Sequence, residues 1–548
     1  MAHALAGKPV QEQDIIDVQT IVDAYFDNVP DMTNPTQLVS FGTSGHRGTS
    51  VDGTFTDLHV AAITQAICDG RKQFGATGPI FVGQDTHALS QPALMTVLEV
   101  LAGNGVTAMV DCDMAFVPTP SVSRAIIRYN EEHDDKADGI IITPSHNPPD
   151  NGGIKYNTII GGPADTVVTK WIEMRANEYL TAYCESEDFK RISIDNIEPT
   201  AQVPYDYKGL YVEELGDVIN MEAIKAAGPK VLVDTLGGSG ASYWNAIKER
   251  YGLDLTIIHD DYDPTFSFMT YDHDGKVRMD CSSTYVMASV INRIGDFDLA
   301  VGNDPDYDRY GIVVSSGLIS ANTFLTLAAR YLFTTRGWKN KGVGKTVVCT
   351  TMIDKWAADA ETPVFEVPVG FKYFSQLLFD GAIGIGGEES AGASFLKKDG
   401  TVWTTDKDGM IMALLSMEIM AVMGKSALKM ADESLEEFGN PSFGRIDAPC
   451  KKEQKQILKQ MSAELITATT VDGDPITNIR TTSLYNDMPI DGVRVETDKG
   501  WFVARPSGTE DLYKIYGESY KGDLGLVALL TAGEEIVNAA LNGTIETE

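Results

Sequence analysis

The chain has 548 residues, of which 43% are hydrophobic and 22% are charged, and its formal net charge is −34. This length exceeds what one hydrophobic core organises and, at roughly 100–200 residues per domain, predicts three to five domains. The acidic surplus argues against nucleic-acid binding, because a phosphate backbone needs a basic surface, and no apolar run approaches the ~18 residues that span a bilayer.

The cysteines and the N-terminus point to a reducing compartment. Six cysteines are scattered along the chain without close pairs, a pattern that indicates free thiols and no disulfide framework or zinc ribbon. Residues 1–10 lack the basic segment and apolar core of a secretory signal. We therefore expect a cytoplasmic protein that binds neither nucleic acid nor a membrane.

The first 50 residues contain one predicted helix and one glycine-rich loop. Apolar residues recur at helical spacing over 14–27. The sequence Phe-Gly-Thr-Ser-Gly-His-Arg-Gly follows at 41–48. Glycine lets backbone amides approach an anion, and Arg47 is a bidentate donor, although a plain glycine-rich turn is the alternative for this loop taken alone.

Three successive segments repeat one pattern, in which strands alternate with helical stretches and one strand delivers a polar loop. The delivering strands are predicted at 140–142, 297–301 and 382–385, and the segments open with strands at 80–82, 231–234 and 346–349. Such alternation is typical of α/β layers with helices on both faces.

The last ~110 residues read as a smaller α+β domain, with helices at 454–465 and 524–541 and strands around 492–495 and 501–504. We predict an α/β protein of three similar αβα-layered domains with mixed sheets, plus this domain, around a central cleft. The predicted boundaries are 1–205, 206–320, 321–438 and 439–548.

The first polar loop is Thr-Pro-Ser-His-Asn-Pro-Pro at 143–149, directly after the strand Ile-Ile-Ile. Pro144 ends the strand, and the proline pair at 148–149 forbids a helix across the turn. Ser145 is thus held on a stiff loop at a strand end, where α/β sheets carry their chemistry.

The second polar loop holds Asp304, Asp306 and Asp308 after a predicted strand. Three carboxylates at alternate positions repel one another unless a cation neutralises them, and oxygen-only ligands favour Mg²⁺ or Ca²⁺ over zinc. An EF-hand does not fit, because its sixth and twelfth positions are Arg309 and Ser315 instead of Gly and Glu.

The third and fourth loops suit a phosphorylated sugar. Gly-Gly-Glu-Glu-Ser-Ala-Gly at 386–392 offers carboxylates and a hydroxyl to sugar hydroxyls. Arg-Pro-Ser-Gly-Thr-Glu at 505–510 offers a guanidinium, two hydroxyls and free amides to a phosphate monoester. Taken alone, the loop at 386–392 is equally compatible with a glycine-rich connector, and the loop at 505–510 fits a turn with a surface arginine better than a binding site.

Two glycine-rich segments resemble nucleotide motifs and fail the comparison. Gly-Val-Gly-Lys-Thr at 342–346 has Lys339 where a P-loop begins with glycine, and we place it before a strand instead of after one. Gly-Gly-Ser-Gly at 237–240 follows a strand, but the dinucleotide pattern then needs glycine where Tyr243 stands.

The four loops together describe one chemistry. A serine can accept a phosphoryl group, a cation can neutralise charge on that group during transfer, and the remaining loops can hold a phosphorylated sugar. The sequence therefore predicts a phosphosugar enzyme that works through a phosphoserine.

The same four loops, in this order and one per domain, resemble the signature loops of the α-D-phosphohexomutase superfamily. The resemblance covers essentially the whole chain and is nearest to the bacterial phosphoglucomutase branch, through the segments 278–283, 369–372, 386–392 and 405–409. It implies an isomerase that interconverts α-D-glucose 1-phosphate and glucose 6-phosphate through a phosphoserine and glucose 1,6-bisphosphate, with Mg²⁺ as cofactor and a monomer or homodimer as the assembly.

The resemblance also implies roles for particular residues. Ser145 would carry the phosphoryl group and, through its phosphate, share Mg²⁺ with Asp304, Asp306 and Asp308. The residues expected to line the reacting end are Arg47, His146, Lys155, Arg309, Lys372 and Lys407. Those expected to bind sugar hydroxyls are Glu388 and Ser390, and those expected to grip the unreacting phosphate are Arg505, Ser507, Gly508 and Thr509.

Three alternatives differ from this prediction in class or in substrate. A phosphomannomutase or phosphoglucosamine mutase shares the superfamily, and only the 386–392 loop favours glucose. A two-zinc phosphatase needs histidine ligands near its carboxylates, yet all eight histidines lie at or before His273. A non-catalytic phosphoserine scaffold would not need the metal, sugar and phosphate loops together.

Overall fold

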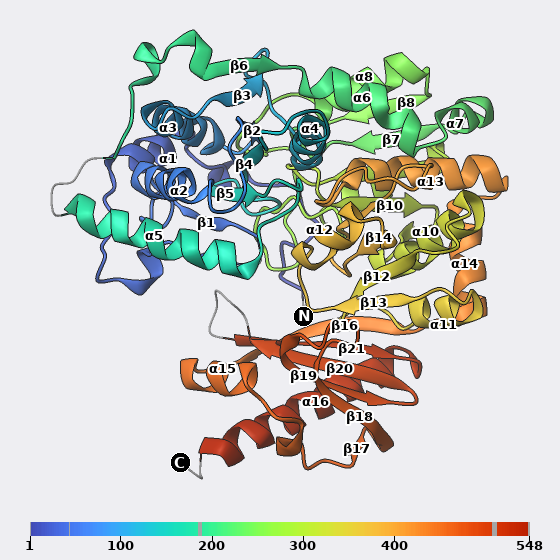
Figure 1. Cartoon of the computed structure of the whole chain (residues 1–548). Helices are drawn as coiled ribbons and strands as arrows, with labels where there is room; N and C mark the ends of the chain where they lie inside the picture. The colour runs from blue at the N-terminus through green and yellow to red at the C-terminus, as the bar shows by residue number, and fades with distance from the viewer. Residues whose placement is uncertain (1, 43, 185–188, 507–511, 546–548) are drawn as a thin grey trace. The chain divides into compact units, whose positions relative to one another are not determined.

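The computed structural model describes residues 2–42, 44–184, 189–506 and 512–545. They form two compact units, whose elements are labelled in Figure 1. The first unit contains residues 1–320, 375–381 and 390–428, and the second contains residues 321–374, 382–389 and 429–548.

The first sheet of the first unit is mixed and has the order β1-β5-β4-β2-β3-β6. Strands β4, β2, β3 and β6 run parallel, whereas β5 is antiparallel to both β4 and β1. The strands are β1 (His46–Thr49), β2 (Ile80–Gln84), β3 (Ala108–Asp111), β4 (Asp138–Ile142), β5 (Asn151–Asn157) and β6 (Gln202–Tyr205).

Helices cover both faces of this sheet (Figure 1). Ile140 and Ile142 of β4 share a core with α2 (Asp57–Gly70), α3 (Ser90–Gly103) and α5 (Thr166–Cys184). Ile141 points the other way, into a cluster with α4 (Thr119–Glu132). A strand buried on both faces reads as a continuous apolar run, which explains the three isoleucines before the serine loop.

The second sheet is also mixed and has the order β11-β10-β9-β7-β8. Its strands are β7 (Val231–Asp234), β8 (Leu255–Ile258), β9 (Leu299–Asn303), β10 (Tyr310–Val314) and β11 (Gly317–Leu318). β7 is parallel to β8 and β9, and β10 is antiparallel to β9 and β11. The apolar helix α13 (Gly409–Met423) packs on β9 and β10, so the polar loop after β9 is held by a buried strand.

In the second unit, β12 (Gly342–Thr346) lies between β13 (Val364–Val367) and β14 (Ile383–Gly387), and all three are parallel. The helix α10 (Ala321–Arg336) packs on β14 and on α11 (Met352–Asp359). The predicted strand at 346–349 was wrong, because the glycine-rich segment before it forms the strand. An added Cβ on Gly344 would lie 2.9 Å from the side chains of Phe374 and Ile383, so close packing requires glycine in this strand.

The C-terminal sheet is antiparallel, with the order β16-β21-β20-β19-β18-β17. Its strands are β16 (Ser442–Pro449), β17 (Thr470–Val471), β18 (Asp474–Thr482), β19 (Pro489–Thr497), β20 (Gly500–Pro506) and β21 (Leu512–Ser519). The helices α15 (Lys452–Lys459) and α16 (Gly522–Ile545) cover one face.

By length and composition, α16 is the single unbroken helix among the described residues that could span a membrane, and α13 with α14 (Ala427–Phe438) forms a bent pair that passes the same test. We did not expect this from the sequence. Leu529, Leu530 and Val537 of α16 are buried in the core of the C-terminal sheet.

The structure confirms the predicted α/β class, with helices layered on mixed sheets and a C-terminal α+β domain. The predicted domain boundaries remain predictions. The N-terminal helix α1 (Val18–Asp27) begins later than predicted, because the side chain of Asp17 accepts a hydrogen bond from the amide of Gln19 and caps the helix there.

Candidate active site

The serine loop follows β4 and holds Ser145 in a strained conformation. Ser145 has φ 61°, in the left-handed region that a residue with a side chain rarely adopts. Its amide donates to Thr143 Oγ1 at 2.8 Å. Its Oγ donates to Asp304 Oδ2 at 3.0 Å and lies 3.3 Å from His146 Nδ1. The hydroxyl thus points at the carboxylate loop.

The three carboxylates of the second loop converge as predicted from their spacing. Asp304, Asp306 and Asp308 are fully buried, and one ligand atom from each lies within 4.8 Å of the others. Tyr307 between them has φ 62°, and its amide donates to the carbonyl of Asp304 at 2.9 Å. This left-handed residue closes the loop so that alternate side chains face one point.

Two lysines from distant parts of the chain neutralise part of this charge. Lys155 Nζ donates to Asp306 Oδ2 at 2.6 Å and to Asp308 Oδ2 at 3.2 Å, and Lys407 Nζ lies 2.7 Å from Asp308 Oδ2. Burial opposes ionisation, but the charges of Lys407 and Lys155 hold the pKa of Asp308 well below its ordinary value.

Asp304 has no lysine partner among the described residues. Burial, followed by the charges of Asp306 and Asp308, raises its pKa well above the ordinary value. One oxygen each of Asp306 and Asp308 is also buried without a hydrogen-bond donor in the part of the chain that the structure describes. The group therefore has acceptor oxygens left over and three carboxylates that disfavour one another's ionisation, which is the property of a cation site.

Further cations and one additional carboxylate surround this group. Arg309 NH1 lies 3.4 Å from Asp280 Oδ2, and His146 Nε2 lies 3.8 Å from the same oxygen. Burial and the charge of Arg309 hold the pKa of His146 well below its ordinary value. Arg47 lies in β1, where the carboxylates of Asp306 and Asp308 partly offset the lowering of its pKa by burial.

Ser390 lies beside the same loop, because residues 391–392 pair with it. Arg309 and Gly392 form an antiparallel bridge, and the amide of Tyr310 donates to the carbonyl of Ala391 at 3.2 Å. The first unit therefore brings together Ser145, the aspartate triplet and, of the other predicted residues, Arg47, His146, Lys155, Arg309, Ser390 and Lys407.

The remaining predicted residues lie in the second unit. Glu388 is buried directly after β14, Lys372 begins α12 (Lys372–Phe379), and Arg505 lies in β20 opposite Lys514 of β21. Burial raises the pKa of Tyr516, the charge of Glu389 raises it further, and the charge of Arg505 lowers it. The glutamate loop and Arg505 therefore both influence the charge of this one tyrosine. Ser507, Gly508 and Thr509 lie outside the described residues.

Sequence reasoning gave no role to three residues that contact the site. Thr119, the first residue of α4, donates from its amide to the carbonyl of Asp306 at 3.0 Å and from Oγ1 to Asp306 Oδ2 at 2.8 Å. Asp280 faces His146 and Arg309. The pKa of the neighbouring Asp406 is raised by burial and lowered by Lys155 and Lys407. A proline on each side of Thr119 was the available sequence signal.

The segment 237–240, rejected above as a nucleotide motif, supports the carboxylate loop. The amide and Oγ of Ser239 both donate to the carbonyl of Pro305 at 2.8 Å. A Cβ on Gly240 would lie 2.4–2.6 Å from ring atoms of Tyr307, and one on Gly238 would lie 2.8 Å from the Cα of Pro305. These glycines permit the close approach of two backbones.

We therefore expect Gly240→Ala to displace Tyr307 and to destabilise the protein by about 1–3 kcal/mol, as overpacking does. Catalytic activity should fall about 10-fold or more, because small misplacements of reacting groups are costly. Thermal unfolding and steady-state kinetics measure both effects. Gly295→Ala is the matched control, since a Cβ there meets nothing within 4 Å. Equal behaviour of the two variants would refute this role for Gly240.

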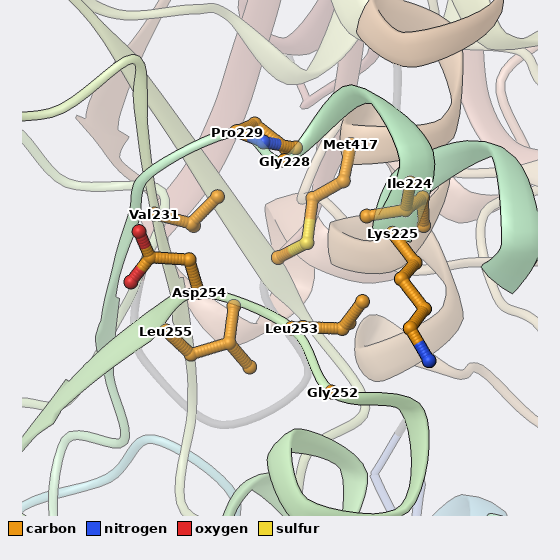
Figure 2. A pocket seen from close by; sticks show the side chains of 10 residues that line it. All are labelled: Ile224, Lys225, Gly228, Pro229, Val231, Gly252, Leu253, Asp254, Leu255 and Met417. Carbon is orange, nitrogen blue, oxygen red and sulfur yellow. The ribbon is translucent and has the colours of Figure 1, made fainter.

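A small cavity of about 70 Å³ lies elsewhere in the first unit (Figure 2). It is lined by Met417 of α13, by Ile224 and Lys225 of α7 (Met221–Ala227), and by the turns before β7 and β8 with the first residue of each strand. β7 and β9 are parallel, and the cavity lies where β7 begins, whereas Asp304 follows the end of β9. The cavity and Asp304 are therefore at opposite ends of the strands. It is also much smaller than the roughly 300–1,000 Å³ typical of ligand pockets.

Comparison with known proteins identifies the family. Four domains of phosphoglucomutase/phosphomannomutase match in order: α/β/α domain I at residues 38–182, α/β/α domain II at 210–317, α/β/α domain III at 320–438 and the C-terminal domain at 447–524. A phosphoglucomutase from Komagataeibacter xylinus is 46% identical over 539 residues, which are 97% of each chain. The chain belongs to the phosphoglucomutase/phosphomannomutase family.

More distant relatives share the same organisation. Phosphoglucomutase 1 of Saccharomyces cerevisiae is 26% identical over 88% of each chain. The open form of Paramecium parafusin matches with a TM-score of 0.72 at 19% identity, over 94% of this chain and 96% of that one. A putative phosphomannomutase from Thermus thermophilus matches with a TM-score of 0.71 at 23% identity, over 91% and 99%. The family models and the 46% identical phosphoglucomutase confirm the predicted superfamily. They also confirm the predicted enzyme class, which is a mutase and therefore an isomerase.

Proposed function

We propose that this chain is a phosphoglucomutase that interconverts α-D-glucose 1-phosphate and glucose 6-phosphate, with Ser145 as the phosphoryl carrier. The observation that carries the proposal is the position of Ser145 Oγ, 3.0 Å from the buried triplet at Asp304. The 46% identity to a phosphoglucomutase over 97% of both chains supports the choice of glucose.

The oxygen-only triplet suits Mg²⁺, because two of its carboxylate oxygens accept no hydrogen bond from the described residues. Asp304, Asp306 and Asp308 would hold the ion together with a phosphate oxygen on Ser145. When bound, Mg²⁺ supplies charge neutralisation for the transferring phosphoryl group.

In the forward direction, the P–O bond at phospho-Ser145 breaks and a new P–O bond forms at O6 of glucose 1-phosphate. The O6 proton leaves to a base, the released Ser145 oxygen takes up a proton, and the product is glucose 1,6-bisphosphate. The bisphosphate then turns end for end. Its 1-phosphoryl group returns to Ser145 as the serine hydroxyl loses its proton and O1 gains one, and glucose 6-phosphate departs.

Several parts of the chain have roles in this cycle. Asp304 and His146 are the described groups that lie beside Ser145 Oγ and can accept its proton. Arg47, Lys155, Arg309 and Lys407 supply positive charge at the reacting end, with Lys372 assigned to the same end. Glu388 and Ser390 are assigned to sugar hydroxyls, and Arg505, Ser507, Gly508 and Thr509 to the unreacting phosphate.

We expect conversion of glucose 1-phosphate to require both Mg²⁺ and a trace of glucose 1,6-bisphosphate. Removal of the metal with EDTA should lower the rate about 100-fold or more, because Lewis-acid stabilisation contributes several kcal/mol to transfer, and added Mg²⁺ should restore it. A coupled assay of glucose 6-phosphate measures the rate. Full activity in EDTA would contradict the proposed metal dependence.

The same assay separates the family's possible substrates. Turnover of glucose, mannose and glucosamine 1-phosphates should rank glucose first. A higher kcat/KM for mannose 1-phosphate would replace the proposal with a phosphomannomutase. A cytoplasmic location and a monomeric or homodimeric state are part of the proposal, and light scattering of the purified chain tests the latter.

A further inference from the structure

A buried acid–histidine pair lies behind the serine loop, outside the residues considered so far. Asp85 follows β2 directly, and its amide donates to the carbonyl of Ile142 at the end of β4 at 3.0 Å. Asp85, His87 and Ser90 are at most 1% exposed. The side-chain hydrogen bonds described for Asp85 and His87 go to Ser90, to each other and to the serine loop, and none of them reaches Ser145 Oγ.

The carboxylate of Asp85 organises the entry to the serine loop. It accepts hydrogen bonds from Thr143 Oγ1 and Ser90 Oγ, both at 2.6 Å, from His87 Nδ1 at 2.9 Å and from the His87 amide at 3.0 Å. Because the Thr143 hydroxyl donates its proton to Asp85, its lone pair is free to accept from the Ser145 amide at 2.8 Å. One carboxylate thereby fixes the amide of the strained serine.

The histidine holds the exit of the same loop. His87 Nε2 lies 3.0 Å from the carbonyl oxygen of Asn147, while Nδ1 faces Asp85. Both neighbours are acceptors, because a carbonyl has no proton and the Asp85 carboxylate already receives three other donors. With Asp85 ionised, both ring nitrogens therefore donate, and this arrangement makes the ring an imidazolium.

The surroundings of His87 favour this charge. Burial alone would lower the pKa of His87, but the neighbouring carboxylate of Asp85 raises it above the ordinary value. Burial would raise the pKa of Asp85, but the charge of His87 and the hydrogen bond from it keep that pKa below its ordinary value. The ring of Phe266 lies 5.0 Å from the imidazole centroid and excludes water from that side.

We infer that Asp85 and His87 form a charged brace, which holds both ends of the serine loop and keeps Ser145 in its left-handed, transfer-ready conformation. The hydrogen bonds described for the pair reach the residues around Ser145 and not its hydroxyl, so both are positioning residues. Asp85 binds Thr143 before Ser145, and His87 binds Asn147 after it. A strained backbone conformation persists only when the surrounding structure fixes it in this way. This inference rests on the proposed role of Ser145.

Three variants of His87 separate the two contacts of the ring. Asn places an amide near the position of Nδ1, Gln places one near that of Nε2, and Ala has neither donor. We expect His87→Asn and His87→Gln each to lower kcat about 10-fold and His87→Ala about 100-fold, as misplacement of a reacting group does. KM for glucose 1-phosphate should stay within about threefold, because no substrate contact is removed.

His59→Asn is the matched control. His59 is also a fully buried histidine of the first domain, with ring nitrogens 2.9 Å from Thr56 Oγ1 and 2.8 Å from the carbonyl of Gln37, and it has no contact with the serine loop. It should lose stability but keep kcat within about twofold. An equal fall in kcat for His59→Asn and His87→Asn would overturn the brace.

Two readouts do not depend on activity. In ¹⁵N-histidine-labelled protein at pH 7.5, both ring nitrogens of His87, assigned by their loss in His87→Asn, should resonate as protonated nitrogens. In His87→Ala, which lacks both donors, hydrogen exchange should accelerate at the Ser145 and Asn147 amides and remain unchanged in the peptide containing His59. A neutral ring, or unchanged exchange in the loop, would overturn the inference.

Ser145→Ala in the same assay distinguishes the two failures. If Ser145→Ala is inactive while all His87 variants retain wild-type kcat, the brace is wrong and the proposed function stands. If Ser145→Ala retains full activity, the proposed function is wrong, and the nitrogen resonances and loop exchange still decide whether the brace exists.

Discussion

Replacing Ser145 with alanine is expected to lower kcat for glucose 1-phosphate at least about a thousandfold, or about 4 kcal/mol of activation free energy, even when glucose 1,6-bisphosphate is supplied. The loss follows because alanine has no oxygen at the position that faces the aspartate triplet, where Ser145 Oγ lies 3.0 Å from Asp304 Oδ2. Coupled kinetics and the mass of the intact protein, which reports the phosphoryl group, measure the loss.

Stability separates this chemical effect from damage to the fold. Because Ser145 has φ 61°, Ser145→Gly should relieve strain and should unfold at a higher temperature than Ser145→Ala, with a difference of up to about 1 kcal/mol. Both variants should be equally inactive. Ser50→Ala, which removes another buried hydroxyl bonded to the carbonyl of Ile21, should keep kcat. Near-full activity of Ser145→Ala would refute the carrier role.

The sequence was informative wherever chemistry is confined to one short loop. The strand before Ser145 and the convergence of three aspartates at alternate positions follow from local rules of proline, branched side chains and charge repulsion. The structure has these features. The catalytic and binding roles of individual residues remain predictions, as do the domain boundaries.

Contacts between distant segments could not be predicted. Lys155 and Lys407 stand 252 positions apart yet meet at Asp308, and Thr119 reaches Asp306 from another domain's helix. Asp85 and His87 follow a different strand from Ser145, and only the parallel pairing of β2 with β4 brings them behind the serine loop. Strand order and partner choice are tertiary properties, which periodicity does not contain.

Glycine was the main source of error in secondary structure. The segment Gly342–Thr346 forms the central strand β12, because its glycines admit neighbouring aromatic rings. Gly238 and Gly240 likewise mark close approach to Pro305 and Tyr307. In each case the glycine serves packing between segments.

Asp304→Asn is expected to separate stability from activity. The Asn oxygen can still accept from the Arg309 amide, as Asp304 Oδ1 does at 2.9 Å, and its NH₂ group can donate to Ser145 Oγ. The substitution therefore preserves shape and hydrogen bonds while it removes a carboxyl crowded by two others. Mg²⁺-dependent turnover should fall about 100-fold or more, whereas the metal-free variant should unfold at the same temperature as the wild type or higher.

The stability difference between the metal-free wild type and Asp304→Asn should depend on pH. The pKa of Asp304 is raised by burial and by its two neighbours above the ordinary value of 3.8. The stability associated with its protonated form is therefore complete below pH 3.8 and is lost as the pH rises through the raised folded pKa. In EDTA, the wild type should lose stability relative to Asp304→Asn as the pH rises across this window, as thermal unfolding at several pH values will measure.

Added Mg²⁺ should reverse that order, because an ion that binds only the folded state stabilises it by mass action. The unfolding temperature of the wild type should rise with Mg²⁺ concentration, and that of Asp304→Asn should rise much less. Asp234→Asn is the control: it also loses a buried carboxylate at a strand end of the same sheet, and it should keep the Mg²⁺-induced rise. If Asp304→Asn responded to Mg²⁺ as the wild type does, Asp304 would not be a ligand, and the triplet would be a charge cluster balanced by lysines alone.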